Sequence, residues 1–429
     1  MGSKKYLATL WGIVFVEAFI VLVLLGEGYK GVLVGDGKVF HNIAENLVHH
    51  GVFALTSDVP TESPHPTMSR PPGYSLFLAG IYTVFGESFF IVRVVQFLLI
   101  WVTAVGIYWL ARLYCDEASA KVSGVLCATY LPMAFFAIYH YSEILSAVLL
   151  VSVIYCAKSF TDKSRYIDAM LTGLLLGCLV LVRANFMLLV LFLAGGFMLA
   201  SLHSQKHLPA TQLKKLSIFV LSFLLVMTPW LLRNRVLSGK WVFSSAVYLS
   251  LYASALQYNQ KLSYAFTNDD WKIFLADLNS RAEKARAELG DHATRPELEL
   301  KIDESYKDSL SKEIRDINVS LLPRNLLLRV GYLWSANDMS PSEIYATFYH
   351  RIAQVHYLLI SLLILVGVWR MRMKILSNWL LWITALYLTL VHLVFHIEAR
   401  YSLPARPLLL IYASMAITAP FLKPKTFER

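Results

Sequence analysis

The sequence contains a few acids and arginines beside its apolar runs, where helices embedded in lipid seldom carry charge. Asp36 stands between Gly35 and Gly37, directly after the first apolar run. A carboxylate within hydrogen-bond reach of a hydroxyl group can take its proton as a new bond forms, which is general base catalysis. Arginines supply positive charge and paired hydrogen bonds to phosphate oxygens. These residue types therefore suit a substrate that carries a phosphate.

The candidate residues come from six segments that lie far apart in the chain. They are Asp36, Arg70, Tyr74, His140, Glu143, Arg183, Arg233, Asn234, Glu398, Arg400 and Tyr401. Each has an ordinary structural alternative, which stays open at this point. An aspartate before a helix commonly caps it, an interfacial arginine commonly anchors its helix by snorkelling, and Glu143 could simply pair with an arginine. His392 and His396 share a helix face, but no third ligand is evident, so a metal site is not favoured.

The composition is that of a membrane protein. The 429 residues are 57% hydrophobic and only 16% charged, with a mean hydropathy of +0.54. Soluble domains contain about a quarter charged residues. The net charge of +10 would suggest nucleic acid in a soluble protein, but basic residues in the loops on one side of a membrane explain it equally well. We therefore expect a lipid bilayer as a partner and no nucleic acid.

The elements that must position the candidates are membrane-spanning helices of about 20 residues each. We expect about ten of them, at 6–26, 89–111, 118–138, 142–158, 166–182, 185–202, 216–232, 355–369, 376–395 and 403–422. The apolar segment 74–85 is too short to span and suits a re-entrant or interfacial helix. The segment 36–50 has apolar residues at helical spacing and predicts an amphipathic helix. The predicted fold class is an all-α polytopic membrane protein.

The distribution of basic residues predicts the sidedness. With the N-terminus in the cytoplasm, each inside segment carries at least two lysines or arginines, whereas the short outside turns carry only Arg183 and Arg400. Counting 74–85 as a span would reverse every later loop and destroy this pattern. The chain then divides into an N-terminal membrane module, 1–232, with an outer loop at 27–88; an extracytoplasmic helical loop, 233–352; and a C-terminal membrane module, 353–429.

This topology places all six candidate segments at one membrane interface. Transporters tend to carry ionisable groups near the middle of the bilayer. In this sequence the middle is nearly free of them, with Glu17 as the main exception. A site at one interface instead suits an enzyme whose substrate has a lipid tail, a phosphate at headgroup depth and a polar group beyond it.

Several motifs resemble those of GT-C type glycosyltransferases that use polyprenyl-phosphate sugars, in the bacterial branch related to protein O-mannosyltransferases and the lipid A aminoarabinose transferase. They follow one another over most of the chain. They are Asp36 with the helix after it, SRPPGYSLFLAGIYTVFG from 69, YSE from 141, LVRANF from 181, TPWLLRNRVLSGKW from 228 and EARYSLPARPLLL from 398. Singly each motif is weak, but their order and spacing make the resemblance fairly specific.

The resemblance implies a GT-C-like fold with two large extracytoplasmic loops, in the bacterial cytoplasmic (inner) membrane. The implied reaction transfers a hexose or pentose from a polyprenyl phosphate to a hydroxyl of a glycan, lipid or protein acceptor. Independently of the resemblance, a single base and in-line attack predict inversion at the anomeric carbon. No cofactor is expected to be required, and dependence on a divalent metal is not indicated but stays open. Asp36 matches the proposed base; the arginines and Tyr74, Asn234 and Tyr401 would bind the donor, with His140, Glu143 and Glu398 in support. A flippase or transporter of a lipid-linked saccharide, or a polysaccharide polymerase or ligase, remains the alternative.

Overall fold

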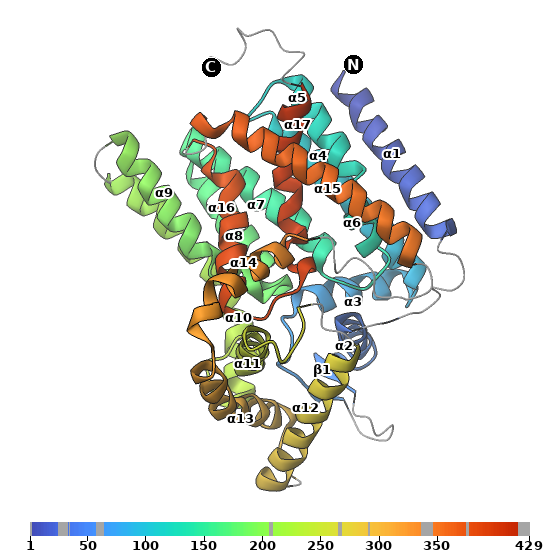
Figure 1. Ribbon diagram of the computed structural model, residues 1–429, viewed down its shortest axis with the longest axis vertical. Helices are drawn as coiled ribbons and strands as arrows, with labels where there is room; N and C mark the ends of the chain where they lie inside the picture. The colour runs from blue at the N-terminus through green and yellow to red at the C-terminus, as the bar shows by residue number, and fades with distance from the viewer. Residues whose placement is uncertain are drawn as a thin grey trace.

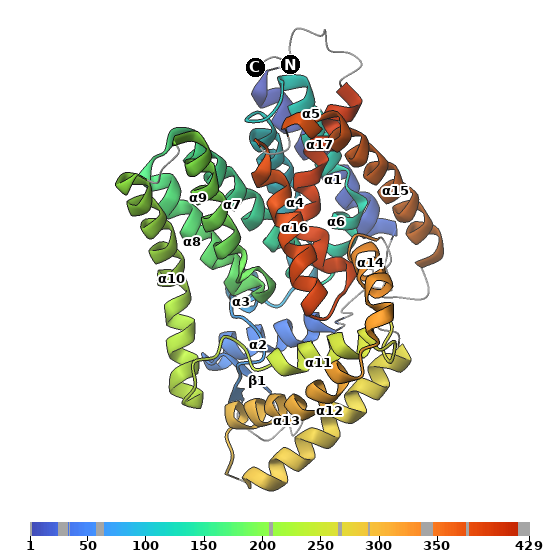
Figure 2. The ribbon, with the colours of Figure 1, turned by 60° about the vertical axis from the view of Figure 1, so that its left-hand side comes forward.

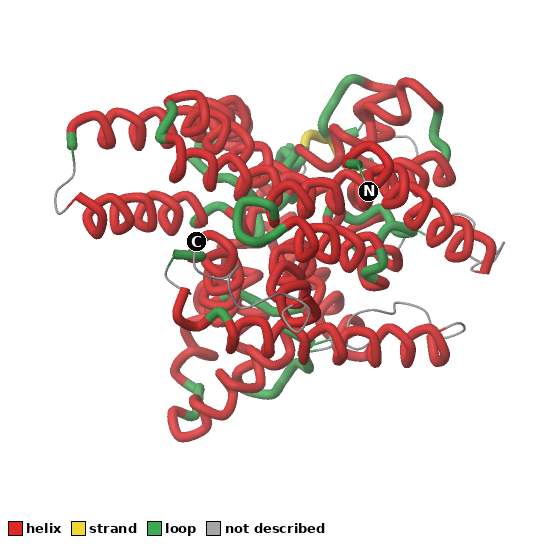
Figure 3. Tube along the Cα trace, turned by 90° about the horizontal axis from the view of Figure 1, so that it is seen from above, coloured by secondary structure: helices red, strands yellow, loops and turns green. Residues whose placement is uncertain are grey.

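The computed structural model of the chain consists almost entirely of helices joined by loops (Figure 1). It describes residues 2–24, 33, 35–56, 64–205, 209–264, 268–290, 292–335, 346–374 and 377–418. Seen from above, strand occupies one small place among the helices (Figure 3). The predicted all-α class is confirmed, and the chain is a polytopic membrane protein.

The membrane bundle is formed by apolar helices of different lengths. Their bounds are α1 Ser3–Leu24, α4 Phe89–Ala111, α5 Glu117–Ala128, α6 Leu131–Phe136, α7 Glu143–Lys163, α8 Tyr166–Val182, α9 Leu189–Gln205, α10 Ala210–Ser238, α15 Ala346–Arg370, α16 Trp379–Val394 and α17 Arg406–Thr418. The described residues also include the single-turn 3₁₀ segments η2 Ala184–Phe186, η3 Val319–Leu321 and η4 Arg372–Lys374. The longer η5, Ala399–Ala405, leads into α17.

Six helical stretches in the described part of the chain are long and apolar enough to cross a membrane, and they coincide with six predicted spans. Three further predicted spans, 166–182, 355–369 and 376–395, coincide with shorter apolar helices. The last predicted span, 403–422, covers most of η5 and α17, and its residues beyond 418 lie outside the described part. The predicted span 118–138 is not one continuous helix, because α5 ends at Ala128 and α6 begins only at Leu131, beside Pro132.

A second layer lies across one end of the bundle (Figure 2). It contains α2 Asp36–His50, α3 Gly73–Phe85, α11 Val247–Tyr258, α12 Asn268–Leu289, α13 Arg295–Arg315 and α14 Leu322–Leu333. A small antiparallel hairpin joins α2 to α3, with β1 Ala54–Leu55 pairing β2 His65–Pro66. α1 begins at the opposite end of the bundle (Figure 1). The layer is therefore the part of the molecule that can hold a site at one membrane face.

α2 is the amphipathic helix that the sequence predicts. Its apolar face buries Phe40, Ile43 and Ala44, and the Phe40 ring meets the edge of Tyr74 on α3 at 5.1 Å between ring centroids. The helix ends at Gly51, whose φ of 67° lies in the left-handed region, and the Gly51 amide donates back to the last turn. Packing of α2 on α3 fixes the start of the helix, where Asp36 lies.

Close contact between α8 and α10 depends on two glycines. A Cβ atom on Gly173 would lie 2.2 Å from the carbonyl oxygen of Phe219, and one on Gly177 would lie 2.7 Å from the Val226 Cβ. Helices in membranes associate through small residues that let their backbones approach. The GxxxG pair in this helix thus serves packing rather than a site.

Candidate active site

Asp36 is the first residue of α2, and it lies between two glycines whose lack of a side chain lets the backbone pass close to Tyr141 and His140. Gly35 has a φ of 49°, and a Cβ there would lie 3.2 Å from the Tyr141 hydroxyl. A Cβ on Gly37 would lie 3.3 Å from the carbonyl oxygen of His140. The Asp36 side chain does not cap the helix, because Gly35 is the N-cap residue and no side-chain capping bond is formed. The capping alternative is therefore wrong, and the carboxylate is available for other partners.

The two oxygens of Asp36 each bind a different arginine. Oδ1 accepts from Arg70 Nη2 at 2.8 Å, and Oδ2 accepts from Arg400 Nη2 at 2.9 Å. Arg70 stands just before α3, whereas Arg400 comes from η5, so the fold joins residues 364 positions apart. Burial by itself would raise the pKa of Asp36, but the two guanidinium groups outweigh it and hold that pKa far below its ordinary value. In this state Asp36 is an ionised and weakly basic carboxylate.

Arg400 also binds Glu398, which in turn accepts from Tyr401. The Arg400 Nε–Glu398 Oε2 distance is 2.5 Å, and the Tyr401 hydroxyl donates to Glu398 Oε1 at 2.7 Å. Burial opposes the charge on Glu398, but Arg400 and then His396 favour it, and its pKa falls to about 2. Burial and the Glu398 charge raise the pKa of Tyr401 well above its usual range. Tyr401 is therefore a neutral hydrogen-bond donor.

Glu143 forms the inner end of the same cluster. It begins α7 and is 1% exposed, and its Oε1 lies 2.8 Å from Arg183 Nη1 and 3.5 Å from Arg400 Nη1. Arg183, directly after α8, also lies over the Tyr401 ring at 5.3 Å. Asp36 and Arg70 are more accessible, with side chains 27% and 34% exposed. The cluster thus has a buried inner end and an outer end that faces solvent.

The structure brings seven candidates together in this cluster, which we call the Asp36 cluster. Its members are Asp36, Arg70, Glu143, Arg183, Glu398, Arg400 and Tyr401. Tyr141, which lies in the motif YSE but was not among the candidates, belongs beside it, because Arg400 lies over its ring at 4.9 Å. The cluster holds three arginines and three carboxylates, so these charged groups balance one another.

Arg233 and Asn234 have a different location from the one expected. Arg233 donates to the carbonyl oxygens of Phe53 and Thr67, each at 2.9 Å, and lies over the Trp230 ring at 4.7 Å. Asn234 donates to Val242 and Phe243 carbonyls. Among the contacts described for these two residues, none reaches the Asp36 cluster. Arg233 therefore clamps the ends of the β1–β2 hairpin, since its guanidinium donates to backbone carbonyls there, whereas Asn234 holds the segment that follows α10.

The remaining candidates lie at the border of the cluster. Tyr74 is fully buried on α3, and its hydroxyl has no hydrogen-bond partner among the described residues. His140 packs its ring on Phe89 at 4.8 Å, and burial lowers its pKa to about 3, so it is neutral. Neither residue makes a hydrogen bond to the cluster in the described part of the chain.

His392 and His396, which were considered as metal ligands, instead pack against Tyr401. The His392 ring stacks on Tyr401 at 4.9 Å, and its Nδ1 atom lies 3.0 Å from the His396 carbonyl oxygen. His396 meets the edge of the same tyrosine at 5.5 Å. Their arrangement fixes the Tyr401 ring beside Glu398.

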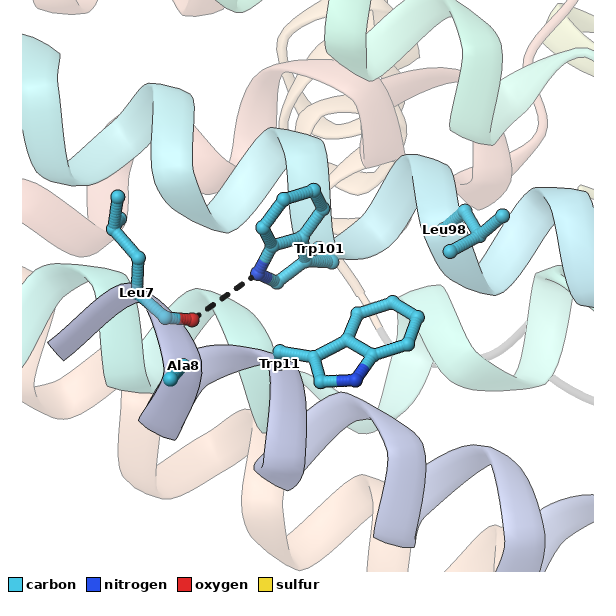
Figure 4. A pocket seen from close by; sticks show the side chains of 5 residues that line it. All are labelled: Leu7, Ala8, Trp11, Leu98 and Trp101. Carbon is cyan, nitrogen blue, oxygen red and sulfur yellow. Dashed lines mark hydrogen bonds between the residues drawn. The ribbon is translucent and has the colours of Figure 1, made fainter. Parts of the chain in front are cut away.

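A pocket elsewhere in the molecule has no chemistry of this kind. It lies between α1 and α4 and is lined by Leu7, Ala8, Trp11, Leu98 and Trp101 (Figure 4). The Trp101 indole donates to the Leu7 carbonyl at 3.4 Å. The lining contains no charged or nucleophilic side chain, so we assign the reactive site to the Asp36 cluster.

Comparison with known proteins agrees with the expected fold. Residues 69–232 match the family model described as dolichyl-phosphate-mannose-protein mannosyltransferase. This segment carries Arg70, Glu143 and Arg183 of the cluster. No curated protein matches the chain.

Solved structures of other proteins match this chain over nearly its whole length. The apo oligosaccharyltransferase of Archaeoglobus fulgidus matches with a TM-score of 0.56 at 14% identity, over 98% of this chain and 51% of that one. The same organism's oligosaccharyltransferase AglB, in complex with an inhibitory peptide and a dolichol-phosphate, gives a TM-score of 0.52 at 14% identity, over 98% and 51%. ArnT from Cupriavidus metallidurans bound to undecaprenyl phosphate gives 0.47 at 12% identity, over 99% and 82%.

This chain spans about half the length of the oligosaccharyltransferases that it matches. The structural likeness and the family model together confirm the predicted resemblance to GT-C glycosyltransferases at the level of fold.

Proposed function

We propose that this chain is a membrane glycosyltransferase that moves a sugar from a polyprenyl phosphate to an acceptor hydroxyl, with Asp36 as general base. The observation that carries the proposal is the sharing of one carboxylate between Arg70 and Arg400 at the accessible end of the cluster. The matched family, described as using dolichyl-phosphate mannose, and the AglB complex with dolichol-phosphate support a lipid-phosphate ligand.

The arginines serve the phosphate once the donor is bound. A phosphodiester brings one negative charge to the outer end of the cluster, where it competes with Asp36 for Arg70 and Arg400. Guanidinium groups bind phosphate oxygens in a fixed, bidentate geometry. As the arginines turn toward the phosphate, Asp36 loses the partners that lower its pKa, and its pKa rises toward the ordinary value. Donor binding therefore converts Asp36 from a counter-ion into a base.

The transfer step then requires only this carboxylate and the arginines. The acceptor oxygen forms a bond to the anomeric carbon while the bond from that carbon to the phosphate oxygen breaks. The acceptor proton moves to Asp36, and polyprenyl phosphate leaves as an anion stabilised by the arginines. Attack opposite the leaving phosphate inverts the anomeric centre. Because the leaving group is already stable as an anion, we propose that the step requires no general acid and no cofactor.

Charge balance favours a monophosphate donor over a diphosphate. Arg70, Arg183 and Arg400 face three carboxylates, so the cluster has no surplus of positive charge. A diphosphate would bring an additional negative charge into a largely buried site, where an unpaired charge is costly. A phosphodiester needs only the exchange of partners described above.

The proposed site lies at the extracytoplasmic face of a bacterial cytoplasmic membrane. The second layer of helices, which carries Asp36, is on the side that the basic loops predict to be outside. The donor tail would remain in the lipid while its sugar meets a glycan, lipid or protein acceptor above the bilayer. The sugar is a hexose or pentose in this proposal.

The test is turnover by the purified protein in liposomes with a radiolabelled polyprenyl-phosphate sugar and a panel of acceptor classes. We expect release of polyprenyl phosphate by the wild type and a loss of roughly 10²–10⁴-fold in Asp36→Asn, since the amide cannot accept the proton. Asp308→Asn, which changes an exposed carboxylate on α13, is the control and should keep full turnover. Near-normal turnover by Asp36→Asn excludes the base assignment. Transfer of intact donor across the bilayer without release supports the flippase alternative.

A further inference from the structure

Arg329 on α14 is a fully buried arginine outside the Asp36 cluster. It is 0% exposed, and no carboxylate pairs with it among the described residues. Its Nη2 atom donates to the backbone carbonyls of His392 at 2.9 Å and Phe395 at 2.5 Å. Its guanidinium carbon lies 4.4 Å from the Tyr258 ring centroid. These contacts place the cation between Tyr258 at the end of α11 and the backbone at the end of α16.

Gln257 on α11 binds the backbone of Ile397, two residues beyond Phe395. Its Oε1 atom accepts from the Ile397 amide at 3.2 Å, and its Nε2 atom donates to the Ile397 carbonyl at 3.3 Å. Arg329 Nη1 donates to the same Oε1 atom at 3.3 Å, so the two side chains form one unit. The Tyr258 hydroxyl adds a bond of 2.6 Å to the Leu393 carbonyl. The backbone from 392 to 397 is thus fixed by side chains of α11 and α14.

This backbone leads directly into the Asp36 cluster. α16 ends at Val394, and the last carbonyls of a helix have no hydrogen-bond donors within it. The guanidinium of Arg329 is such a donor for the carbonyl of His392. Glu398 follows Ile397 in an extended conformation, and Arg400 lies three residues beyond Ile397. A shift of the Ile397 peptide therefore moves both Glu398 and Arg400. Burying a cation without a counter-ion is unfavourable, and what this one secures is the geometry of that segment.

We propose that Arg329 and Gln257 are positioning residues, which hold the 392–397 backbone so that Arg400 meets Asp36 before the donor binds and the donor phosphate afterwards. The inference rests on the proposed function for its catalytic consequence. It gives the helical segment 233–352 a role in the reaction, although neither side chain contacts the cluster. Displacement of a binding group by about 1 Å can lower a rate by about 100-fold.

The first test measures position without relying on activity. Hydrogen–deuterium exchange of the detergent-solubilised chain should show faster exchange of the 395–401 amides in Arg329→Met, by about 10-fold or more, with the other helices unchanged. Gln257→Met should free the Ile397 amide in particular. Arg324→Met, an exposed arginine on the same helix, is the matched control. Unchanged exchange at 395–401 in a folded Arg329→Met or Gln257→Met variant overturns the proposal, whatever reaction the protein performs.

The second test asks whether the effect passes through Arg400. We expect Arg329→Met to raise the donor KM about 10-fold and to lower kcat about 10- to 100-fold, with the acceptor KM within about twofold of wild type. In an Arg400→Gln background the same change should have little further effect, because the group being positioned is gone. Arg329→Lys should recover part of the activity. Equal loss in both backgrounds indicates general destabilisation and contradicts the proposal, whereas absence of turnover in the wild type contradicts the proposed function alone.

If Arg329→Met does not fold, Gln257→Met and Arg329→Lys carry both tests. Both keep a side chain of similar length in a buried position, so the volume of the site changes little. Each is compared with Arg324→Met in the same detergent.

Discussion

Asp36 faces two requirements that a single ion pair would not meet. As a base it must be free to accept a proton, yet with no donor bound it neutralises two arginines that would otherwise repel each other. The structure shows Asp36 neutralising the two arginines, with one arginine bound to each carboxylate oxygen. The proposed exchange of partners reconciles the two, since the phosphate replaces the carboxylate. This makes the basicity of Asp36 depend on whether donor is bound.

The exchange predicts different pH dependences for two kinetic parameters. kcat/KM reports the free enzyme, in which Arg70 and Arg400 hold the Asp36 pKa far below 3.8, so it should stay flat as pH falls through the ordinary carboxyl range. kcat reports the bound complex, in which the arginines face phosphate, so its acidic limb should lie about one unit or more higher. Initial rates between about pH 3.5 and 8 in liposomes measure both limbs.

Arg70→Gln provides the matched comparison for this pH test. Removing one of the two arginines takes away part of what lowers the pKa of Asp36, so the acidic limb of kcat/KM should move to higher pH. The exposed Arg324→Met should leave it in place. Coincident limbs in the wild type, or no movement in Arg70→Gln, would show that Asp36 keeps its arginines throughout the reaction.

At the residue scale, the sequence predicts which residue types lie near the membrane boundary, but not which way their side chains point. Asp36, Glu143 and Arg400 stand out in the sequence because charged groups at an apolar boundary are unusual, and the fold brings them together. Arg233 has the same character, yet it lies on the side of α10 that meets the hairpin. Arg329 is not among the residues predicted from the sequence, and only the fold shows that it is buried. Hydrophobic periodicity does not encode which distant backbone an arginine will meet.

At the scale of elements, the length of an apolar segment predicts a helix, whereas a break in a helix depends on individual residues such as proline. The helix predicted at 74–85 is confirmed as α3, Gly73–Phe85. The break between α5 and α6 accompanies Pro132, which begins a helix easily but cannot continue one. The hairpin of β1 and β2 has only two residues per strand and is held by contacts from other elements. No strand pattern of such length can be predicted from sequence.

The hairpin gives a prediction that separates Arg233 from the donor site. Arg233→Met should speed exchange of the 53–56 and 64–68 amides, because the carbonyls of Phe53 and Thr67 lose their donor. Binding of polyprenyl phosphate, measured by microscale thermophoresis, should stay within about twofold of wild type. Glu299, which accepts from the Thr67 hydroxyl and the Met68 amide, holds the hairpin from its other side, so the variant should still fold.

Arg400→Gln is the control for this comparison, since that residue lies in the cluster. It should weaken polyprenyl phosphate binding by about 10-fold or more, on the scale of a lost charge-assisted hydrogen bond. Weakening of the same size in Arg233→Met would return Arg233 to the donor site, as its sequence context first indicated.

At the scale of the whole molecule, the proposed function depends on which side of the membrane the Asp36 cluster faces. The outer layer of α2, α3 and α11–α14 lies at one end of the bundle, and α1 begins at the other (Figures 1 and 2). The distribution of lysine and arginine supplies the direction, because basic loops remain in the cytoplasm. That rule predicts that the layer and the Asp36 cluster face outward, where in the proposed function a lipid-linked donor and an acceptor hydroxyl would meet.

Single cysteines can test this orientation in a background in which the four native cysteines are replaced by alanine. A membrane-impermeant maleimide applied to intact spheroplasts should label Asp308→Cys on α13 but not Lys163→Cys at the end of α7, and inverted vesicles should give the opposite result. Both positions are exposed in the structure, so a difference in labelling reflects sidedness rather than burial. If Lys163→Cys is the one labelled from outside, the Asp36 cluster faces the cytoplasm. Donors and acceptors would then have to be sought among cytoplasmic molecules, and the proposed extracytoplasmic transfer would be wrong even if the chemistry at Asp36 were right.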